Sequence, residues 1–333
     1  MAGQYSTKTS LKSGVPQGSV LGPLLFLLYS APIIDIISDH GLMSHCYADD
    51  TQIYFSCNPD EMVTLANRFT ICITDIECWM KSNRLKLNCD KTELIWICSR
   101  NAHRSLLHFP SINIDNTEIK PVKGARNLGY YFDQQFDMRQ HINTICRQGY
   151  FQIRQLRVIR RSLPSDVLKT LLHAFVASRL DYCNSLFYGL PSCDIKKLQL
   201  VQNAAARLFG GLSKFRHVSP ILRSLHWLPI KQRIDFKIAV LAYKSLHRLA
   251  PVYLQNMCHP VAEFQSLTRN RSATRGDLIP CAWNTVTYGR RTFQFAAPNV
   301  WNKLPLTVRC VASFETFRSH LKTYLFDCAY NAA

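Results

Sequence analysis

The chain has 333 residues, enough for two or three domains with a substantial core. Hydrophobic residues make up 47% of it and charged residues 19%, a composition that indicates a globular protein and excludes a largely disordered one. The N-terminus, MAGQYSTKTS, is polar and unlike a secretory signal, so we expect an intracellular protein that is not secreted. The 13 cysteines include no C-x-x-C pair and no zinc-like Cys/His cluster, and we interpret them as free thiols.

The net charge of +18 is unevenly distributed along the chain. Residues 1–100 hold 8 Lys and Arg against 10 Asp and Glu, a balance of −2, whereas residues 101–333 hold 32 against 12, a balance of +20. A basic excess of this size favours a polyanionic partner, for which nucleic acid is the usual choice. A soluble domain that is simply basic is the alternative that composition leaves open.

The first predicted element is a loop followed by an apolar helix. Residues 13–30 read SGVPQGSVLGPLLFLLYS, in which glycine and proline recur until about Pro23, where we expect the helix to begin. A loop at a helix N-terminus can bind phosphate, although the G-K-[ST] ending of a P-loop is absent and a structural turn is an equal alternative. Glycine, proline and aspartate interrupt the apolar run Val20–Ile37, so we predict a buried helix and no membrane span.

Residues 45–55, HCYADDTQIYF, come next. Apolar and polar residues alternate on both sides of Asp49 and Asp50, which predicts a strand, a tight turn and a second strand. No Lys or Arg lies within eight residues of the two aspartates. Adjacent carboxylates repel each other unless a cation lies between them. The pair is therefore either a solvated turn or part of a metal site.

The segment after the hairpin predicts one long helix and several strands. Residues 58–61, NPDE, predict a helix start, and apolar residues at helical spacing then predict a core stripe formed by Leu65, Phe69, Cys72, Ile73, Ile76, Trp79 and Met80. Residues 85–99, LKLNCDKTELIWICS, predict a short strand, a turn holding Lys91 and a strand at 93–98. Residues 112–119 predict a hairpin turning at Asp115-Asn116, and residues 126–133 predict a further strand. This order predicts an α+β fold with a sheet covered on one face.

From Met138 onward the pattern becomes helical. A helix predicted at about 138–162 carries arginines and no acidic residue up to Arg161, and four of them share one face: Arg147, Arg154, Arg157 and Arg161. This face is either solvated or directed at phosphates. Further helices are expected at about 165–188, 194–209, 217–226 and 230–248. The tail is expected to mix aromatic-rich strands, as in TVTYGRRTFQF, with a helix near 313–326. We place domain boundaries near 137 and 211.

Three stretches in this order, SGVPQGSVLGPLLF, YADD and LKLNCDKTE, resemble motifs B, C and D of reverse transcriptases from non-LTR (LINE-type) retrotransposons, especially the jockey-like and chicken-repeat lineages. ARNLGYYFD resembles the primer-grip motif that follows. The closing pattern YGRRTFQFAAPNVWNKLP…SFETFRSHLKTYLF resembles the C-terminal region of the same elements. A YADD alone would be weak evidence, but the ordered set is specific.

The resemblance implies a right-hand polymerase that copies RNA into DNA by two-metal nucleotidyl transfer. Residues 1–137 would form a partial palm, residues 138–210 a helical thumb-like region, and residues 211–333 the C-terminal region of the polyprotein. The implied partners are an RNA template, a DNA primer and deoxynucleoside triphosphates, and the implied residence is the nucleus or cytoplasm.

The same resemblance assigns roles to individual residues. Asp49 and Asp50 would hold Mg²⁺ or Mn²⁺, and Lys91 would be a catalytic acid, although a surface lysine in a turn is an equal alternative. The nucleotide and template pocket would be lined by Gly14, Pro16, Gln17, Gly18, Tyr47 and Ala48.

A third aspartate of such polymerases, that of motif A, precedes motif B. Here the residues before Ser13, MAGQYSTKTSLK, contain no acid, while Asp35 and Asp39 fall in or just after a helix. We therefore expect a C-terminal part of a polymerase that is inactive alone. The alternatives are a non-catalytic basic nucleic-acid-binding remnant and an inert relic.

Overall fold

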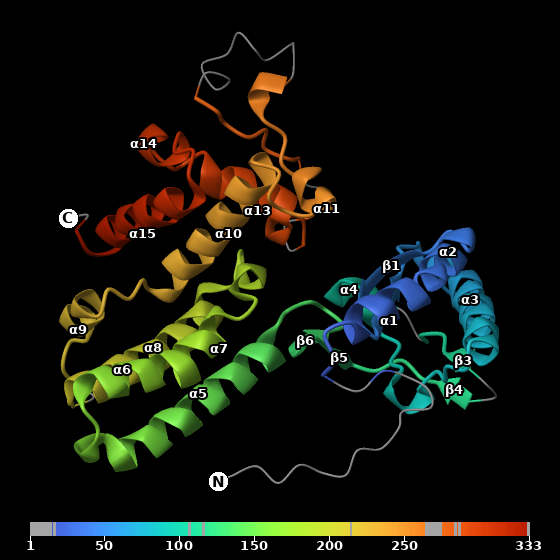
Figure 1. Cartoon of the computed structure of the whole chain (residues 1–333), viewed down its shortest axis with the longest axis horizontal. Helices are drawn as coiled ribbons and strands as arrows, with labels where there is room; N and C mark the ends of the chain where they lie inside the picture. Colours follow the sequence, from blue (N-terminus) through green and yellow to red (C-terminus); the bar gives the residue numbers. More distant parts are fainter. Residues whose placement is uncertain are drawn as a thin grey trace. The chain divides into compact units, whose positions relative to one another are not determined.

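The computed structural model describes residues 15, 18–105, 108–114, 117–213, 215–263, 275–282, 285 and 288–331. The chain divides into two compact units (Figure 1). Unit 1 comprises residues 1–126 and 133–136, and unit 2 comprises residues 127–132 and 137–333. Helices predominate, and the described strands pair into small two-stranded sheets, which agrees with the predicted α+β class. The predicted boundaries near 137 and 211 remain predictions.

Unit 1 opens with two consecutive apolar helices, α1 (Gly22–Ser30) and α2 (Pro32–Asp39), where one helix from about Pro23 is predicted. The prediction that this helix is buried is wrong for α1, in which no residue is buried; Leu28 is 75% exposed. The reason is that no described element covers α1, which is held to the end of the next long helix by the Tyr29 hydroxyl donating to the Asn83 carbonyl at 2.5 Å.

By length and composition Gly22–Asp39 could cross a membrane, although core helices of soluble proteins pass the same test and a single such helix is weak evidence. In this chain Ile33 and Ile37 of α2 are buried in the core of unit 1.

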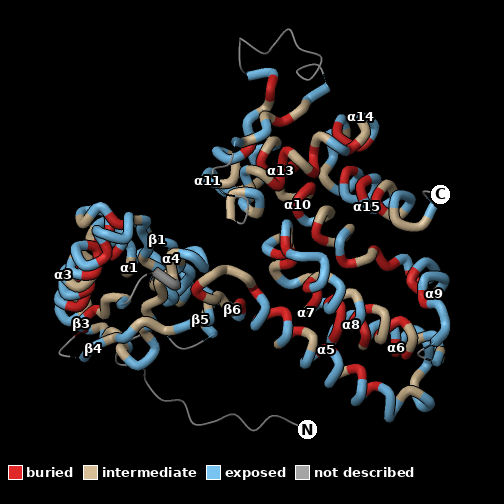
Figure 2. Tube along the Cα trace, turned by 180° about the vertical axis from the view of Figure 1, so that it is seen from behind, coloured by how far each residue is buried: buried red, intermediate tan, exposed pale blue. Residues whose placement is uncertain are grey.

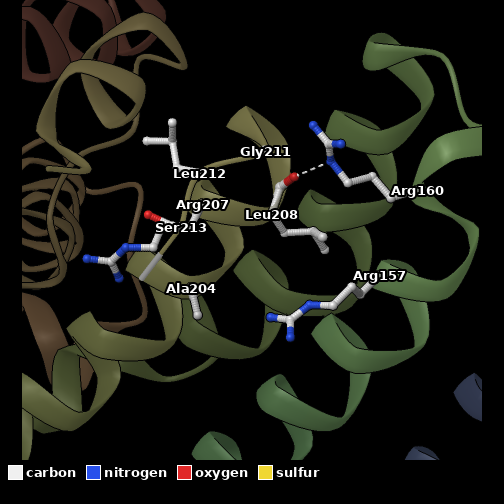
Figure 3. A pocket seen from close by; sticks show the side chains of 8 residues that line it. All are labelled: Arg157, Arg160, Ala204, Arg207, Leu208, Gly211, Leu212 and Ser213. Atoms are coloured by element: carbon white, nitrogen blue, oxygen red, sulfur yellow. Dashed lines mark hydrogen bonds between the residues drawn. The ribbon is translucent and has the colours of Figure 1, made fainter. Parts of the chain in front are cut away.

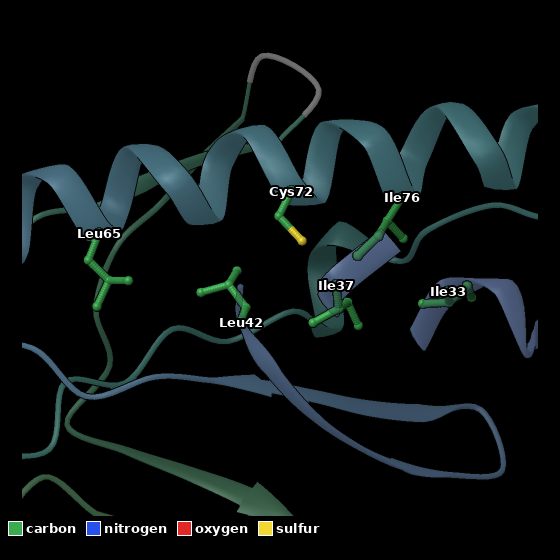
Figure 4. Packing of buried hydrophobic residues seen from close by; sticks show 6 residues of the cluster. All are labelled: Ile33, Ile37, Leu42, Leu65, Cys72 and Ile76. Atoms are coloured by element: carbon green, nitrogen blue, oxygen red, sulfur yellow. The ribbon is translucent and has the colours of Figure 1, made fainter. Parts of the chain in front are cut away.

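The predicted long helix is present as α3 (Met62–Ser82), preceded by a 3₁₀ turn, η1 (Pro59–Glu61). A capping box starts it, in which the Asn58 backbone N–H donates to the Glu61 carboxylate at 3.0 Å. The predicted stripe is confirmed, because all seven of its residues belong to two hydrophobic clusters or pack against them. Figure 4 shows three of its side chains pointing from α3 toward α2 and the start of β1, in a cluster formed by Ile33, Ile37, Leu42, Leu65, Cys72 and Ile76.

The strands predicted in residues 85–99 are wrong. This segment forms only the 3₁₀ turn η2 (Cys89–Lys91) and one isolated bridge between Leu94 and Pro121. Its apolar side chains do pack on the core of unit 1. Trp96 is one of them, and its indole N–H also donates to the Pro110 carbonyl at 2.9 Å. The apolar residues of this segment therefore indicate burial, but its backbone has too few hydrogen-bond partners to form a β-ladder.

One short helix and two hairpins complete the described part of the chain up to residue 133. The predicted hairpin at 112–119 is confirmed as β3 (Ile112–Ile114) paired with β4 (Thr117–Ile119), with its expected turn residues outside the described part. The single strand predicted at 126–133 is instead a hairpin of β5 (Gly124–Asn127) and β6 (Tyr130–Asp133). Leu128 and Gly129 both have positive φ between these strands, as a two-residue hairpin turn requires. A short helix, α4 (Arg100–Ser105), precedes them.

Unit 2 begins with two long helices packed against each other, α5 (Arg139–Ile159) and α8 (Ser192–Gly210). Their buried residues recur along the sides that face each other (Figure 2). A Cβ added to Gly149 would lie 2.6 Å from Val201 Cγ1, so the glycine permits this close approach. Four shorter elements connect α5 and α8 along the chain: α6 (Ser165–Leu172), a π-helical turn η4 (His173–Ala177), α7 (Ser178–Asp181) and η5 (Asn184–Phe187).

The rest of unit 2 surrounds one helix, α10 (Ile230–Leu246), which packs against α13 (Phe293–Trp301) and α15 (Phe314–Tyr330). Tyr243 of α10 is fully buried, stacks on Phe317 at 4.2 Å between ring centroids, and donates to the Ala312 carbonyl at 2.7 Å. The strands predicted in TVTYGRRTFQF are wrong, because its described part forms η7 (Gly289–Arg291) and the start of α13. The remaining helices are α9 (Ser219–Ser224), α11 (Val252–Gln255), η6 (Val261–Glu263) and α14 (Leu306–Arg309).

Candidate active site

The predicted hairpin is confirmed. Strands β1 (Met43–Tyr47) and β2 (Asp50–Tyr54) pair with Tyr47 opposite Asp50, which leaves Ala48 and Asp49 as a two-residue turn. Ala48 has φ 52°, the left-handed value that such turns need at their first central residue and that alanine adopts at a cost of about 1 kcal/mol. Because Asp49 lies in the turn and Asp50 begins β2, both carboxylates are exposed at the tip.

The two faces of the hairpin differ. Opposite residues share a face, so Tyr47 and Asp50 lie on the same side as His45 and Tyr54. These four side chains are exposed, and the His45 and Tyr54 rings stack at 5.1 Å with a 3.1 Å hydrogen bond between the hydroxyl and Nε2. Ile53, on the other face, packs against both hydrophobic clusters of unit 1. The core thus anchors one face and leaves the aromatic and acidic face open.

The residues predicted for the nucleotide pocket are only partly described. Gly14, Pro16 and Gln17 lie outside the described residues. Gly18 has φ +88° with open space where a Cβ would stand, and the Gly22 N–H donates to the Ser19 hydroxyl at 3.1 Å. The described residues from Gly18 to Leu21 therefore form a turn leading into α1, and both predicted alternatives, a binding loop and a structural turn, stay open.

Lys91 is exposed at the end of η2, and its backbone N–H donates to the Asn88 carbonyl at 3.2 Å. Among the described residues, no hydrogen bond or ion pair joins its ammonium to the hairpin carboxylates. Its predicted acid role stays a prediction.

The predicted arginine face is present on α5 and its continuation η3 (Arg160–Ser162). All four side chains, those of Arg147, Arg154, Arg157 and Arg161, are exposed. Across the described part of the chain, none of the four forms an ion pair. Arg139, at the start of the helix, differs: its Nε lies 3.6 Å from the buried Asp194 carboxylate.

Two further arginines were missed as site candidates. Arg160 donates from Nε to the Leu208 carbonyl at 2.6 Å and from Nη2 to the Phe209 carbonyl at 3.2 Å. Arg207 of α8 has a buried Nε without a hydrogen-bond partner among the described residues. The sequence spacing of α5 could not have indicated the Arg160 hydrogen bonds or the burial of Arg207, because both depend on the packing of α5 against α8.

Comparison with known proteins bears on this geometry. The family model of the reverse transcriptase (RNA-dependent DNA polymerase) matches residues 1–132, which include the hairpin and its supporting helices. Residues 1–132 are therefore similar to the reverse transcriptase family. No solved structure gives a significant match.

Three similar proteins are RNA-directed DNA polymerases of mobile elements from Drosophila melanogaster. The chain is 24% identical over 239 residues to the probable RNA-directed DNA polymerase from transposon BS, covering 69% of this chain and 26% of that protein. It is 27% identical over 242 residues to that from transposon X-element, covering 69% and 25%. It is 22% identical over 260 residues to the polymerase from mobile element jockey, covering 74% and 27%. The chain thus spans about a quarter of these relatives, and its predicted resemblance to non-LTR reverse transcriptases is confirmed.

Reverse transcriptases generally use divalent metal ions, so the hairpin residues can be tested against that requirement. Asp49 and Asp50 are the oxygen donors that Mg²⁺ and Mn²⁺ prefer. Among the described residues, however, no group of three or more His, Cys, Asp or Glu side chains lies close enough together to hold a metal ion. Asp35 and Asp39 belong to α2 and do not join the pair. The described residues therefore fit part of a metal site and do not fit a complete two-metal centre.

Proposed function

We propose that this chain serves RNA-directed DNA synthesis as part of a non-LTR retrotransposon reverse transcriptase. In this proposal β1–β2, α2 and α3 are part of the polymerase palm, residues 138–210 are the thumb-like region, and residues 211–333 are the C-terminal region of the polyprotein. An RNA template, a DNA primer and deoxynucleoside triphosphates are the proposed partners, and the nucleus or cytoplasm is the proposed location.

The observation that carries the proposal is the tip of the hairpin. Within the segment that matches the reverse transcriptase family, a two-residue turn presents Asp49 and Asp50 together, and Ile53 fixes the opposite face to the core. A solvated two-residue turn would also place Ala48 in the left-handed region, so the adjacent acids, and not the turn geometry, favour a metal-binding role. Tyr47, on the same face as Asp50, would orient the primer end beside the carboxylates.

The hairpin carboxylates are proposed to bind divalent metal ions only in combination with a further ligand. Two carboxylates leave part of the charge that develops during nucleotidyl transfer uncompensated, and removing one such stabilising group typically costs about 10²-fold or more in rate. We therefore propose that the chain alone does not extend a primer at a measurable rate. Gly14, Pro16, Gln17, Gly18, Ala48 and Lys91 keep their predicted roles in nucleotide binding and acid catalysis within this proposal.

The second candidate function is nucleic-acid binding without catalysis. It is favoured by the +20 balance of residues 101–333 and by four exposed arginines that form no ion pair with a described residue, Arg147, Arg154, Arg157 and Arg161. Arginines of this kind contact phosphates and make binding steeply dependent on salt. This function is compatible with the first, because a polymerase must also hold its template.

Primer extension on a homopolymer RNA template with Mg²⁺ or Mn²⁺ tests the proposal. The chain is compared with its Asp49→Ala/Asp50→Ala variant, and binding of the same primer–template is measured in parallel. We expect binding by both proteins and incorporation by neither. Incorporation that the variant lacks would show that another carboxylate completes the site, and absence of binding at low salt would contradict both candidate functions.

A further inference from the structure

A pocket of about 440 Å³ lies in unit 2 where the ends of α5 and α8 meet. It is formed by one set of arginines and one set of apolar or small residues (Figure 3): Arg157, Arg160, Ala204, Arg207, Leu208, Gly211, Leu212 and Ser213. No acidic residue lines it. Three cationic side chains around a concave surface without a carboxylate make an environment that favours an anion.

The role of Arg160 is to hold the wall of this pocket. The C-terminal end of α8 would by itself repel an anion, because its last carbonyls carry partial negative charge. Arg160 donates to two of these carbonyls, those of Leu208 and Phe209, and so offsets that charge. Gly211, at φ +65°, allows this approach, since a Cβ there would lie 2.7 Å from Arg160 Nη2.

Arg157 and Arg207 are left to meet a ligand. Arg157 is exposed and makes no ion pair with a described residue, and Figure 3 shows its side chain extending from α5 toward α8 near Ala204. Arg207 leaves α8 on the side of Ser213, and its buried Nε has no partner among the described residues. Because this Nε is inaccessible, only the parts of Arg207 that line the pocket can contribute to it, and a guanidinium N–H there pairs best with a phosphate oxygen.

The size and lining of the pocket distinguish a nucleotide from a bare phosphate. A volume of about 440 Å³ falls within the range of small-molecule sites, roughly 300–1,000 Å³, and greatly exceeds what one phosphate group fills. Ala204, Leu208 and Leu212 supply an apolar wall against which a sugar or base can pack.

We propose that this pocket binds one nucleotide unit, with its phosphate held by Arg157, with Arg207 as a further positive charge in the lining, and with its base or sugar against Leu208 and Leu212. This deepens the nucleic-acid binding proposed above and rests on it for the biological source of the nucleotide. The same chemistry is presented by one residue of a bound RNA strand and by a free nucleoside monophosphate.

The test is calorimetric titration of the full chain with AMP, adenosine and inorganic phosphate, at constant ionic strength and with EDTA present. We expect AMP to bind at least about 10-fold more tightly than either adenosine or phosphate, since only AMP engages both walls. Arg157→Ala should weaken AMP binding about 10-fold or more. The control is Lys196→Ala, which removes one positive charge from an exposed position near the start of α8 and should change AMP binding less than about 2-fold.

Gly211→Ala provides a second variant, because it forces Arg160 away from the pocket wall; circular dichroism checks that each variant is folded. To separate the two sources, the variants are also titrated with single-stranded oligoadenylate. A larger loss for Arg157→Ala than for Lys196→Ala with the strand identifies a strand residue as the ligand, and a difference confined to AMP identifies a free nucleotide. Equal binding of AMP and adenosine, or equal losses in Arg157→Ala and Lys196→Ala, would overturn the proposal. Because EDTA removes metal ions, these results do not depend on polymerase activity.

Discussion

The two units of this chain differ in the size and number of the side chains that they bury. Unit 2 buries large aromatic side chains, among them Phe187, Tyr243 and Phe317, between long helices. Unit 1 has two small clusters of aliphatic residues and Cys72, two-stranded sheets, and a helix, α1, without a buried residue. The acidic hairpin lies in unit 1, and the arginine pocket lies in unit 2.

It follows that the candidate catalytic carboxylates are held by a less stable part of the protein than the candidate phosphate-binding arginines. A single two-stranded hairpin is only marginally stable in water, so the tip that holds Asp49 and Asp50 depends on Ile53 and α3 for its position. Segments with few buried contacts open locally at low free-energy cost. We therefore expect the hairpin to open more readily than the contact between α5 and α8.

The largest expected effect is from Phe317→Ala in unit 2. Phe317 is fully buried, with Tyr243 stacked on it and the Trp301 ring 6.0 Å away. We expect the free energy of unfolding of unit 2 to fall by about 3–5 kcal/mol in guanidinium denaturation followed by tryptophan fluorescence. Phe215→Ala, at a side chain that is 84% exposed, is the control and should cost less than about 0.5 kcal/mol. Similar losses in the two variants would mean that unit 2 is not packed as described.

A pH dependence of nearly the same size is expected from His141. Burial beside Tyr130 and Phe187 lowers its pKa from 6.5 to about 4. The folded state therefore resists a proton that the unfolded state accepts, so unit 2 has its full stability above pH 6.5 and loses about 3 kcal/mol as the pH falls toward 4.

The measurement is the free energy of unfolding between pH 4.5 and 7.5 for the chain and for His141→Phe. The variant should lose much of the pH slope in this interval. An unchanged slope would show that other groups cause it.

Gly149→Ala tests the contact between α5 and α8. Helix propensity alone predicts a gain of about 1 kcal/mol. The added Cβ would lie 2.6 Å from Val201 Cγ1, in a position where Val201 is fully buried, so we expect a net loss of about 1–3 kcal/mol. Adding Val201→Ala should cost less in the Gly149→Ala background than alone, which a double-mutant cycle of unfolding free energies measures. A stabilised single variant would contradict the close approach.

The smallest effect is expected at the hairpin turn. Ala48→Val places a β-branched residue at φ 52° and should destabilise the hairpin by about 1 kcal/mol, whereas Ala48→Gly relieves the strain and should be neutral or slightly stabilising. Hydrogen exchange of the β1 and β2 amides gives the local opening free energy. Faster exchange in the glycine variant than in the valine variant would show that the turn is not left-handed at Ala48.

Sequence patterns predicted what local physical chemistry controls. The stripe from Leu65 to Met80 and the alternation around Asp49-Asp50 produced the elements expected of them, because burial on one side was encoded within each segment. Residues 93–98 are a continuous apolar run after Glu93, as in a buried strand, but form no strand, since a strand also needs a partner backbone.

Tertiary contacts were the part that the sequence did not disclose. The exposure of α1 depends on what covers it, and its apolar composition could not report that. Likewise, Arg157 and Arg207 lie 50 positions apart and line one pocket because α5 packs against α8, an approach that Gly149 permits.

Manganese binding is the most direct test of the central claim, which is that Asp49 and Asp50 form part of a metal site that is incomplete. The electron paramagnetic resonance signal of free Mn²⁺ is titrated with the chain and with its Asp49→Ala/Asp50→Ala variant. We predict weak binding, with a dissociation constant of roughly 10⁻⁴ M or higher, that the double variant abolishes. Tight binding of two ions, or binding that the variant retains unchanged, would contradict the account.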